Sequence, residues 1–213
     1  MLDIGELTRI NKELNALYPE QVIYDGVINV AGYNAAKYKI LWVLKEPNDV
    51  DSSSWSLLDF MGEKENLTAY PKWRKTYKLV IKGSYAILNE LTEPDTLPNE
   101  ESSTDVLRQI AYINISKVGG PPKSYYKDIL EYYEKNRPLL LRQIHAIAPD
   151  IIINASRVDI GKDLGACDWQ QVGKFCTSKI SGGRLIDVYH PASRSITHHE
   201  YLATLLKCAS LQN

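Results

Sequence analysis

The sequence predicts an α/β fold in which a central, mostly parallel four-stranded sheet lies between two layers of helices. Segments with helical spacing of apolar residues separate the expected strands. The strands themselves are continuously apolar instead of alternating, as is typical of parallel strands buried on both faces. A chain of 213 residues can bury one sizeable core, so we expect a single domain over residues 1–213. The expected strands are Ile40–Leu44, 110–116, 150–154 and 184–189.

The first half of the chain begins with a predicted helix over residues 4–17, where apolar residues recur at helical spacing. In "QVIYDGVINVAGY", two β-rich runs flank Asp25-Gly26, which predicts a β-hairpin. Ile40–Leu44 follows as the first central strand. A loop and a short helix then lead to a second long helix over residues 72–91.

The second half begins with a predicted surface loop over residues 92–105, which are rich in Pro, Glu, Ser and Thr. The strand 110–116 follows and ends at a Gly-Gly-Pro-Pro turn. Residues 125–147 predict a long helix that Pro138 is expected to divide. After the last two strands, residues 197–210 predict a closing helix.

Composition excludes several classes of protein. No apolar run approaches the ~18 residues of a membrane span, and the N-terminus lacks the basic and then apolar pattern of a signal peptide. The three cysteines, Cys167, Cys176 and Cys208, are odd in number and widely spaced. They indicate reduced thiols and not a disulfide framework or a cysteine metal site. We therefore expect a cytoplasmic protein without a membrane partner.

The net charge of −1 argues against strong binding to nucleic acid across the whole surface. The charges are nevertheless unevenly distributed. The stretch "KWRKTYKLVIK" at 72–82 contains five basic residues and no acid, whereas residues 90–105 contain six acids and no base. Two interpretations stay open: a basic face that binds phosphate, or a solvated helix face beside an acidic loop.

Polar residues follow each predicted strand at the point where the strand ends. Because the carboxyl ends of parallel strands lie along one edge of a sheet, these residues are expected to converge. They include one acid, one amide and one histidine: Glu46, Asn114 and His190. The four segments are 45–49, 114–117, 155–157 and 190–194.

Other catalytic patterns are weaker. Ser156 and Ser193 are possible nucleophiles beside the histidine, but neither stands in a Gly-x-Ser-x-Gly sequence. The glycines of "ISGGR" at 180–184 precede a strand, so they indicate a turn and not a dinucleotide-binding loop. His198 and His199 are adjacent, and adjacent residues on a helix point in different directions. We therefore expect no metal site there.

The order of these motifs resembles the uracil-DNA glycosylase superfamily. "AYINISKVGGPP", "NRPLLLRQIHAIAPDIIIN" and "DVYHPASR" are similar to successive motifs of one branch of that superfamily. The matched stretch extends from about residue 40 to residue 194, which is most of the chain. The resemblance implies the three-layer fold and cleavage of the bond between a base and its deoxyribose in DNA.

The resemblance also implies roles for individual residues. Glu46 stands before Pro47 where related proteins hold the acid that orients water, and Asp49 is the next candidate for that acid. Asn114 matches the asparagine whose amide binds the pairing edge of a flipped base. His190 matches the histidine that donates a hydrogen bond to the base as negative charge develops. Pro47 is expected to border the base.

The remaining implied contacts are with the base face and the DNA backbone. Phe60 is the first candidate for the aromatic that stacks on the base, and Trp55 is the second. Polar residues after three of the strands are assigned to phosphate: Lys117, Ser156, Ser193 and Arg194.

The chain also departs from the superfamily pattern. The first motif lacks the Gly-Gln-Asp-Pro-Tyr and Gly-Glu-Ala-Pro-Gly sequences of well-known branches, and Lys45 and Asn48 are unusual neighbours of Glu46-Pro47. The cysteines that bind a cluster in the iron–sulfur branches are absent, so we expect neither a cluster nor another cofactor. The expected protein is a monomeric hydrolase that acts on DNA.

Alternatives remain at the level of the sequence. The chain could be a catalytically silent relative that binds a nucleotide or nucleic acid, or a hydrolase of small nucleosides or nucleotides. Glu46 could form an ion pair with Lys45 or Arg194, Asn114 could cap a turn, and His190 could be structural. Trp55 and Phe60 suit the hydrophobic core as well as a base-stacking site.

Overall fold

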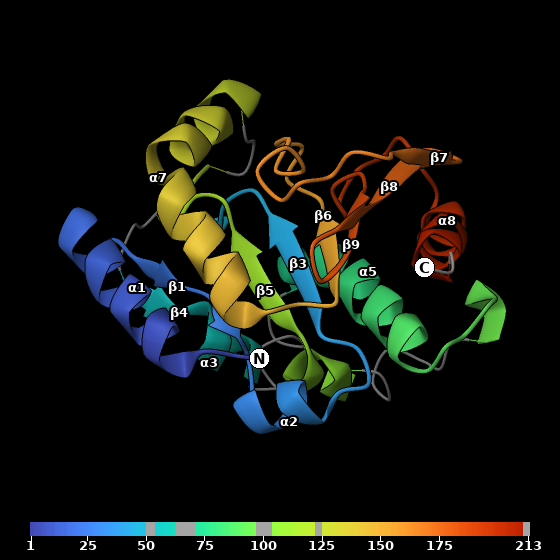
Figure 1. Ribbon diagram of the computed structural model, residues 1–213, viewed down its shortest axis with the longest axis horizontal. Helices are drawn as coiled ribbons and strands as arrows, with labels where there is room; N and C mark the ends of the chain where they lie inside the picture. The colour runs from blue at the N-terminus through green and yellow to red at the C-terminus, as the bar shows by residue number, and fades with distance from the viewer. Residues whose placement is uncertain (50–53, 63–70, 97–103, 122–124, 211–213) are drawn as a thin grey trace.

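The computed structural model describes residues 1–49, 54–62, 71–96, 104–121 and 125–210, with the side chains of 71–75 and 104 left out. It is a mixed α/β structure built on a seven-stranded sheet with the order β2-β5-β3-β6-β9-β8-β7 (Figure 1). The strands of this sheet are β2 (Gly26–Val27), β3 (Ile40–Leu44), β5 (Ala111–Asn114), β6 (Ile151–Asn154), β7 (Gln170–Val172), β8 (Phe175–Ile180) and β9 (Gly183–Asp187).

The four predicted central strands are confirmed as β5, β3, β6 and β9, which are mutually parallel and adjacent. The expectation of a four-stranded sheet is wrong, because antiparallel strands extend both edges: β2 beside β5, and β8 and β7 beyond β9. β2 has two residues and β7 is largely exposed. Neither has the apolar run by which the central strands were predicted.

The predicted hairpin around Asp25-Gly26 is also wrong. β1 (Ile23–Tyr24) pairs with β4 (Trp55–Ser56) in a small separate sheet, and β2 pairs with β5. The Asp25 carboxylate accepts a hydrogen bond from the backbone N–H of Asn114 at 2.8 Å. This contact directs the chain along β5 instead of back onto β1.

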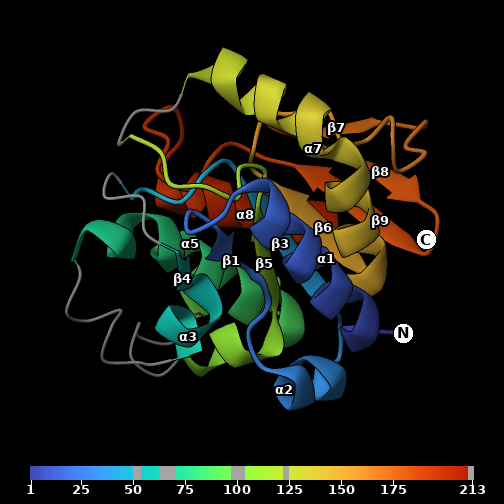
Figure 2. The same ribbon diagram turned by 90° about the vertical axis from the view of Figure 1, so that its left-hand side faces the viewer.

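Helices cover both faces of the seven-stranded sheet. α1 (Ile4–Leu17) and α7 (Tyr126–Ile147) lie side by side on one face, and α5 (Pro71–Leu88) and α8 (His198–Ser210) lie together on the other (Figures 1 and 2). Four shorter helices complete the described chain: α2 (Val30–Ala35), α3 (Leu57–Gly62), η1 (Pro94–Thr96) and η2 (Thr104–Gln109). Among the described residues, no helix is both long and apolar enough to cross a membrane.

Two hydrophobic clusters join the helices to the sheet. One lies between the sheet and α5 with α8, and contains the fully buried Trp42, whose indole N–H donates to Ser84 Oγ at 2.9 Å. The other lies between the sheet and α7. Alternate residues of β3 enter opposite clusters, with Trp42 in the first and Val43 in the second. This burial on both faces explains the uninterrupted apolar run of the strand.

α7 continues for 22 residues through Pro138, so the predicted division of this helix is wrong. Proline removes one backbone donor and crowds the preceding turn. Pro138 lies on the exposed side of α7, where a carbonyl that loses its helical partner can bind water. The apolar face of the helix continues on both sides of the proline and holds it against the sheet.

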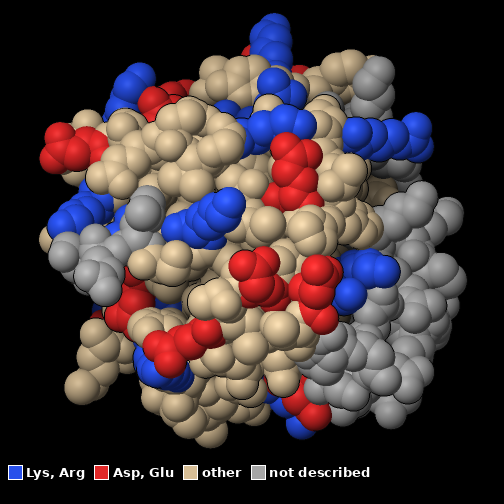
Figure 3. All heavy atoms as spheres, turned by 90° about the vertical axis from the view of Figure 1, so that its right-hand side faces the viewer, with Lys and Arg blue, Asp and Glu red and all other residues tan. Residues whose placement is uncertain are grey.

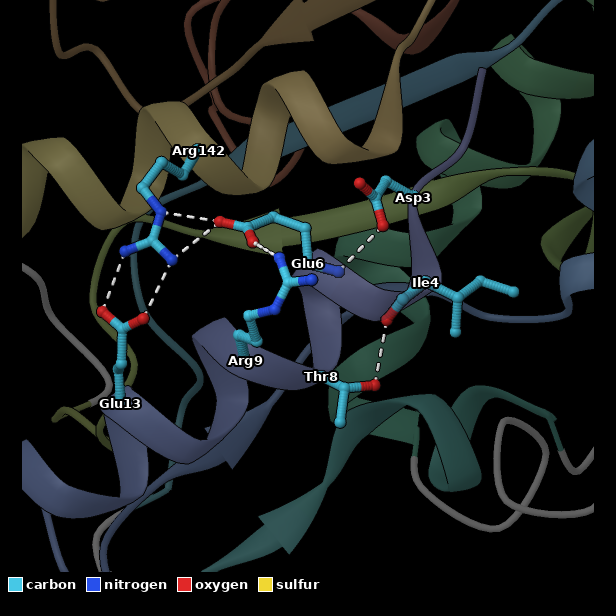
Figure 4. Close-up of polar contacts among 7 residues, drawn as sticks. All are labelled: Asp3, Ile4, Glu6, Thr8, Arg9, Glu13 and Arg142. Atoms are coloured by element: carbon cyan, nitrogen blue, oxygen red, sulfur yellow. Dashed lines mark hydrogen bonds and ion pairs between the residues drawn. The ribbon is translucent and has the colours of Figure 1, made fainter.

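A charged contact fixes α1 to α7 (Figure 4). Arg142 donates two hydrogen bonds of 2.8 Å to the Glu13 carboxylate and one of 2.8 Å to Glu6. The hydrogen bonds from Arg142 lower the pKa of both glutamates. The Asp3 side chain caps the start of α1, and its backbone N–H donates to Ala146 O at 2.8 Å.

Candidate functional site

The carboxyl ends of the four parallel strands meet along one edge of the sheet, which we call the rim. Leu44 pairs with Asn114, Val43 pairs with Asn154, and Asn154 pairs with Asp187. The residues that follow these positions therefore lie at one end of the sheet. This is the edge at which open α/β sheets bind their ligands.

The loop after β3 is held against the two glycines that follow β5. Pro47 O accepts a hydrogen bond from the Gly120 N–H at 2.9 Å, and Asn48 forms a β-bridge with Gly120. A Cβ atom at Gly120 would lie 2.6 Å from Glu46 Cγ, and one at Gly119 would lie 2.3 Å from Asp49 O. Only glycine permits this approach. The pair therefore fixes the position of the half-buried Glu46.

Asn114 presents an unusual buried amide at this rim. The residue is 1% exposed, and neither its Nδ2 nor its Oδ1 has a hydrogen-bond partner among the residues that the structure describes. A buried polar group without a partner costs about 1–3 kcal/mol of stability. Such a group in a folded protein calls for an explanation, and a ligand that completes the two hydrogen bonds is one.

A buried network holds the backbone of Asn114 in place. Asp25 accepts hydrogen bonds from the Asn114 N–H at 2.8 Å, from Lys117 Nζ at 2.6 Å and from Gln143 Nε2 at 3.0 Å. Burial lowers the pKa of Lys117, and the adjacent Asp25 carboxylate opposes that effect. The side chain of Lys117 is 2% exposed, so the phosphate contact predicted for it is wrong. Asp25 was missed because Asp-Gly is the usual signature of a turn.

His190 has a defined protonation state. Its Nδ1 accepts a hydrogen bond from the Ala192 N–H at 3.2 Å, which leaves the ring proton on Nε2. Burial lowers the pKa of the imidazole to about 4, and the positive charge of Lys45 contributes to this shift. His190 is therefore a neutral hydrogen-bond donor at pH 7.

Lys45 interacts electrostatically with both Glu46 and His190. Burial lowers its pKa, the nearby Glu46 raises it, and Arg157 lowers it. The ammonium group also acts on His190. The rim thus combines a carboxylate, an amine, a neutral imidazole and an amide, contributed by the ends of β3, β5 and β9.

Trp55 contacts both of the neighbouring candidates, Asp49 and Phe60. Asp49 Oδ2 accepts a hydrogen bond from the Trp55 indole N–H at 2.6 Å. The Trp55 and Phe60 rings pack edge to face with centroids 5.9 Å apart, and both are partly buried against the core. Asp49 therefore positions an aromatic side chain, and the aromatic pair lies in the chain segment that directly follows the loop after β3.

The predicted phosphate contacts divide into two groups. Ser156 is fully buried, and its hydroxyl donates to Asn154 Oδ1 at 2.6 Å. The prediction that Ser156 binds phosphate is therefore wrong. Ser193 is half-buried and Arg194 is exposed, so both are accessible beside His190. The strand end alone did not distinguish these cases, because burial depends on the neighbouring loops.

Two further features of the rim were not predicted. Burial raises the pKa of Asp187 to about 6, although a hydrogen bond from Asn154 opposes the shift. Arg157 has a positive φ of 72° and lies 5.8 Å from the centroid of the exposed Tyr126 ring. The acid inside the apolar "RLIDVY" was the available signal for Asp187.

The described residues form other surfaces besides the rim. A groove of about 920 Å³ lies at the opposite end of the sheet, where Lys37 already pairs with Glu90 at 2.6 Å. Among the described residues, no cluster of His, Cys, Asp and Glu could hold a metal ion. The basic stretch 72–82 falls partly outside the described side chains. On the face shown in Figure 3, basic and acidic side chains are interspersed.

A scan against protein-family models found no match for this chain, and a search of curated proteins found none.

Proposed function

We propose that this protein is a DNA base N-glycosylase of the uracil-DNA glycosylase type, which hydrolyses the bond between a flipped-out base and its deoxyribose. The observation that carries the proposal is the buried amide of Asn114, whose donor and acceptor both lack partners among the described residues. An amide offers one donor edge and one acceptor edge. The pairing edge of uracil offers the complementary acceptor and donor.

The other rim residues suit the two charges that develop as this bond breaks. The sugar becomes cationic, and a fixed carboxylate such as Glu46 stabilises it and aligns the attacking water. The base becomes anionic, and the Nε2–H of neutral His190 donates a hydrogen bond to its oxygen. Neither step requires a metal or a cofactor.

Access to such a site requires the base to leave the duplex. Enzymes that act on a base flip it into a pocket and stack it against aromatic side chains. Phe60 is the proposed stacking residue, held by Trp55 and Asp49. Ser193 and Arg194 are the proposed phosphate contacts beside His190, DNA is the proposed partner, and the chain is proposed to act as a monomer.

The test is a panel of duplex oligonucleotides that contain uracil, hypoxanthine, xanthine or mismatched thymine, assayed for abasic sites under single-turnover conditions. We expect base release from at least one oligonucleotide. Asn114→Asp should change the order of preference among the bases, because a carboxylate has no donor to offer the base. Asn89→Asp, in which the altered amide lies at the exposed end of α5, is the matched control and should leave the preference unchanged.

The alternatives predict different results in the same panel. Micromolar binding without release of any base would identify a silent relative that uses the same pocket. Release of base from free nucleosides or nucleotides, but not from DNA, would identify a small-molecule hydrolase. Either result would overturn the proposal.

A further inference from the structure

An exposed aromatic ring stands at the rim end of the sheet and takes no part in the proposed hydrolysis. Tyr126 is the first residue of α7, and this helix begins at the end of the sheet toward which β3 points (Figure 1). Tyr126 is 48% exposed. Single exposed apolar side chains are common on protein surfaces. Tyr126 differs from such a residue because a cation is fixed against its ring.

The turn after β6 fixes the Arg157 guanidinium over this ring. Its Cζ lies 5.8 Å from the centroid of the Tyr126 ring, within the range of a cation–π contact. Asn154 closes the turn from both sides: its amide donates to Val158 O at 2.8 Å, and its Oδ1 accepts from the Ser156 hydroxyl at 2.6 Å. These contacts hold Arg157 at its positive φ of 72°, which a non-glycine residue keeps only where the surrounding structure imposes it.

The charge of Arg157 is not neutralised by the described part of the chain. The residue is exposed, and no carboxylate of the described residues forms an ion pair with it. Arg142, in contrast, is neutralised by two glutamates. Because β6 lies between β3 and β9 in the sheet, the turn that carries Arg157 lies between the loops that carry Glu46 and His190. The cation and the ring are therefore available beside the proposed site.

One nucleotide unit offers both partners that suit this pair, a planar base and an anionic phosphate. Aromatic side chains stack on unpaired bases of any sequence, and arginine adds cation–π and phosphate contacts. We propose that Tyr126 and Arg157 form a subsite for an unpaired nucleobase, beside the nucleotide that the rim binds. Tyr126 stacks on this base, and Arg157 contacts its phosphate.

The subsite rests on the proposed function, because a DNA strand at the rim brings such a base within reach. Its partner is a single strand or a locally opened duplex, since the bases of a closed duplex stack on one another and leave no free face for Tyr126. The protein should therefore bind single-stranded DNA more tightly than duplex DNA.

The test measures binding to undamaged DNA by fluorescence anisotropy, so that it does not depend on base release. It uses the full chain, a labelled single strand and the same strand in a duplex. We expect tighter binding to the single strand. Tyr126→Ala should weaken that binding about tenfold, a loss typical of one stacked base. Tyr126→Phe should retain it, because the phenyl ring still stacks.

A second variant and a matched control complete the set. Arg157→Gly should also weaken binding to the single strand, and glycine suits the positive φ, so the loss of the guanidinium adds no backbone strain. Tyr38→Ala removes the ring of a similar pair, in which Lys37 lies 5.7 Å from the Tyr38 centroid beside the groove at the opposite end of the sheet. This control should bind like wild type. Thermal melting gives the folded fraction to which each affinity is referred.

A strand of stable abasic deoxyribose phosphates separates stacking from phosphate contact. It keeps the charges of DNA and has no base, so Tyr126→Ala should bind it as tightly as wild type does. If Tyr126→Ala loses as much affinity for this strand as for the normal strand, the ring does not stack on a base and the inference is overturned.

The remaining outcomes separate the inference from the proposed function. Base release by the wild-type protein, together with single-strand binding that Tyr126→Ala leaves unchanged, would overturn the inference and leave the proposed function standing. Single-strand binding that depends on Tyr126 and on the bases, without base release from any oligonucleotide, would support the inference and contradict the proposed function. Tighter binding to the duplex than to the single strand would also overturn the inference.

Discussion

Glu46 is held by its neighbours more firmly than a residue in an exposed loop would be. The approach of Gly120 to its Cγ and the hydrogen bond to Pro47 O fix the loop that carries it. We expect Glu46→Gln to lower single-turnover base release by about 10²–10³, since the neutral amide cannot stabilise the sugar cation. A melting temperature that falls sharply while base release per folded molecule is retained would instead identify Glu46 as a structural residue.

The lowered pKa of His190 should determine how base release and stability depend on pH. Its pKa in the folded protein is about 4, below the ordinary 6.5. The neutral donor is therefore present throughout the range from pH 5 to 8, and base release should show no inflection near 6.5 that depends on this residue. Stability that depends on neutral His190 should be lost as the pH falls from 6.5 towards 4, because the unfolded chain then binds the extra proton.

The measurement is single-turnover base release and thermal melting of wild type and His190→Ala at half-unit pH intervals. The variant should release base about 10²–10³ more slowly at pH 7. An inflection near 6.5 in wild type that disappears in the variant would show that the histidine titrates at its ordinary pKa and would contradict this prediction.

The raised pKa of Asp187 should make the stability of the fold depend on pH in the opposite direction. Burial raises its pKa from 3.8 to about 6, so the folded protein prefers the neutral carboxyl and loses stability as the pH rises through this window. Asp187→Asn removes the ionisation and keeps an oxygen that can accept from Asn154. We expect a higher melting temperature than wild type at pH 7.5, with a difference that shrinks as the pH approaches 4. An equal difference at both pH values would mean that ionisation is not the cause.

At the scale of elements, the contact between the loop after β3 and the turn after β5 connects the sheet to the site. Gly120→Ala would place a methyl group 2.6 Å from Glu46 Cγ and displace the carboxylate. A displacement of ~1 Å can lower a rate by about 10², and we expect a loss of that order in base release. Gly62→Ala is the matched control, because a Cβ there meets no atom of the described residues within 4 Å. Equal activity of the two variants would contradict the contact.

The elements that the sequence predicted well are those whose pattern reflects burial alone. β3, β5, β6 and β9 are continuously apolar because both faces are covered, and α1 shows its apolar stripe directly. β7 was missed because an exposed edge strand has no such pattern. β2 was predicted as one strand of a hairpin, and its pairing with β5 was missed because a two-residue strand does not indicate its partner. Their pairing depends on contacts from distant parts of the chain.

The site shows the same division between local pattern and distant contact. The positions of Glu46, Asn114 and His190 at strand ends follow from the order of the strands. Lys117 and Ser156 have the same polar character, but both are buried, and their side chains bond to Asp25, which is distant in the sequence, and to the nearby Asn154. Strand ends therefore predict where a site lies, whereas the surrounding packing decides which polar residues reach it.

At the scale of the whole molecule, the net charge of −1 means that DNA binding must depend on local cations. Each phosphate that a cation neutralises lowers the slope of log K against log salt by about 0.9. We expect binding to weaken steeply between ~50 and ~200 mM salt. Arg194→Ala should make the slope less negative by about 0.9, the contribution of one phosphate contact. Lys179→Ala, an exposed residue at the opposite end of the sheet, should leave the slope unchanged. Affinity that does not change with salt would contradict phosphate binding at the rim.

The bridge between Asn48 and Gly120 also determines when the site can form. The loop after β3 leaves the ribosome well before its partner after β5, and His190 follows later still. Contacts between distant segments form only after the intervening chain has been ordered, which makes them slow. We therefore expect the rim to assemble late, after the central strands have aligned. In a refolding chain, we expect secondary structure to return first and base release to return last.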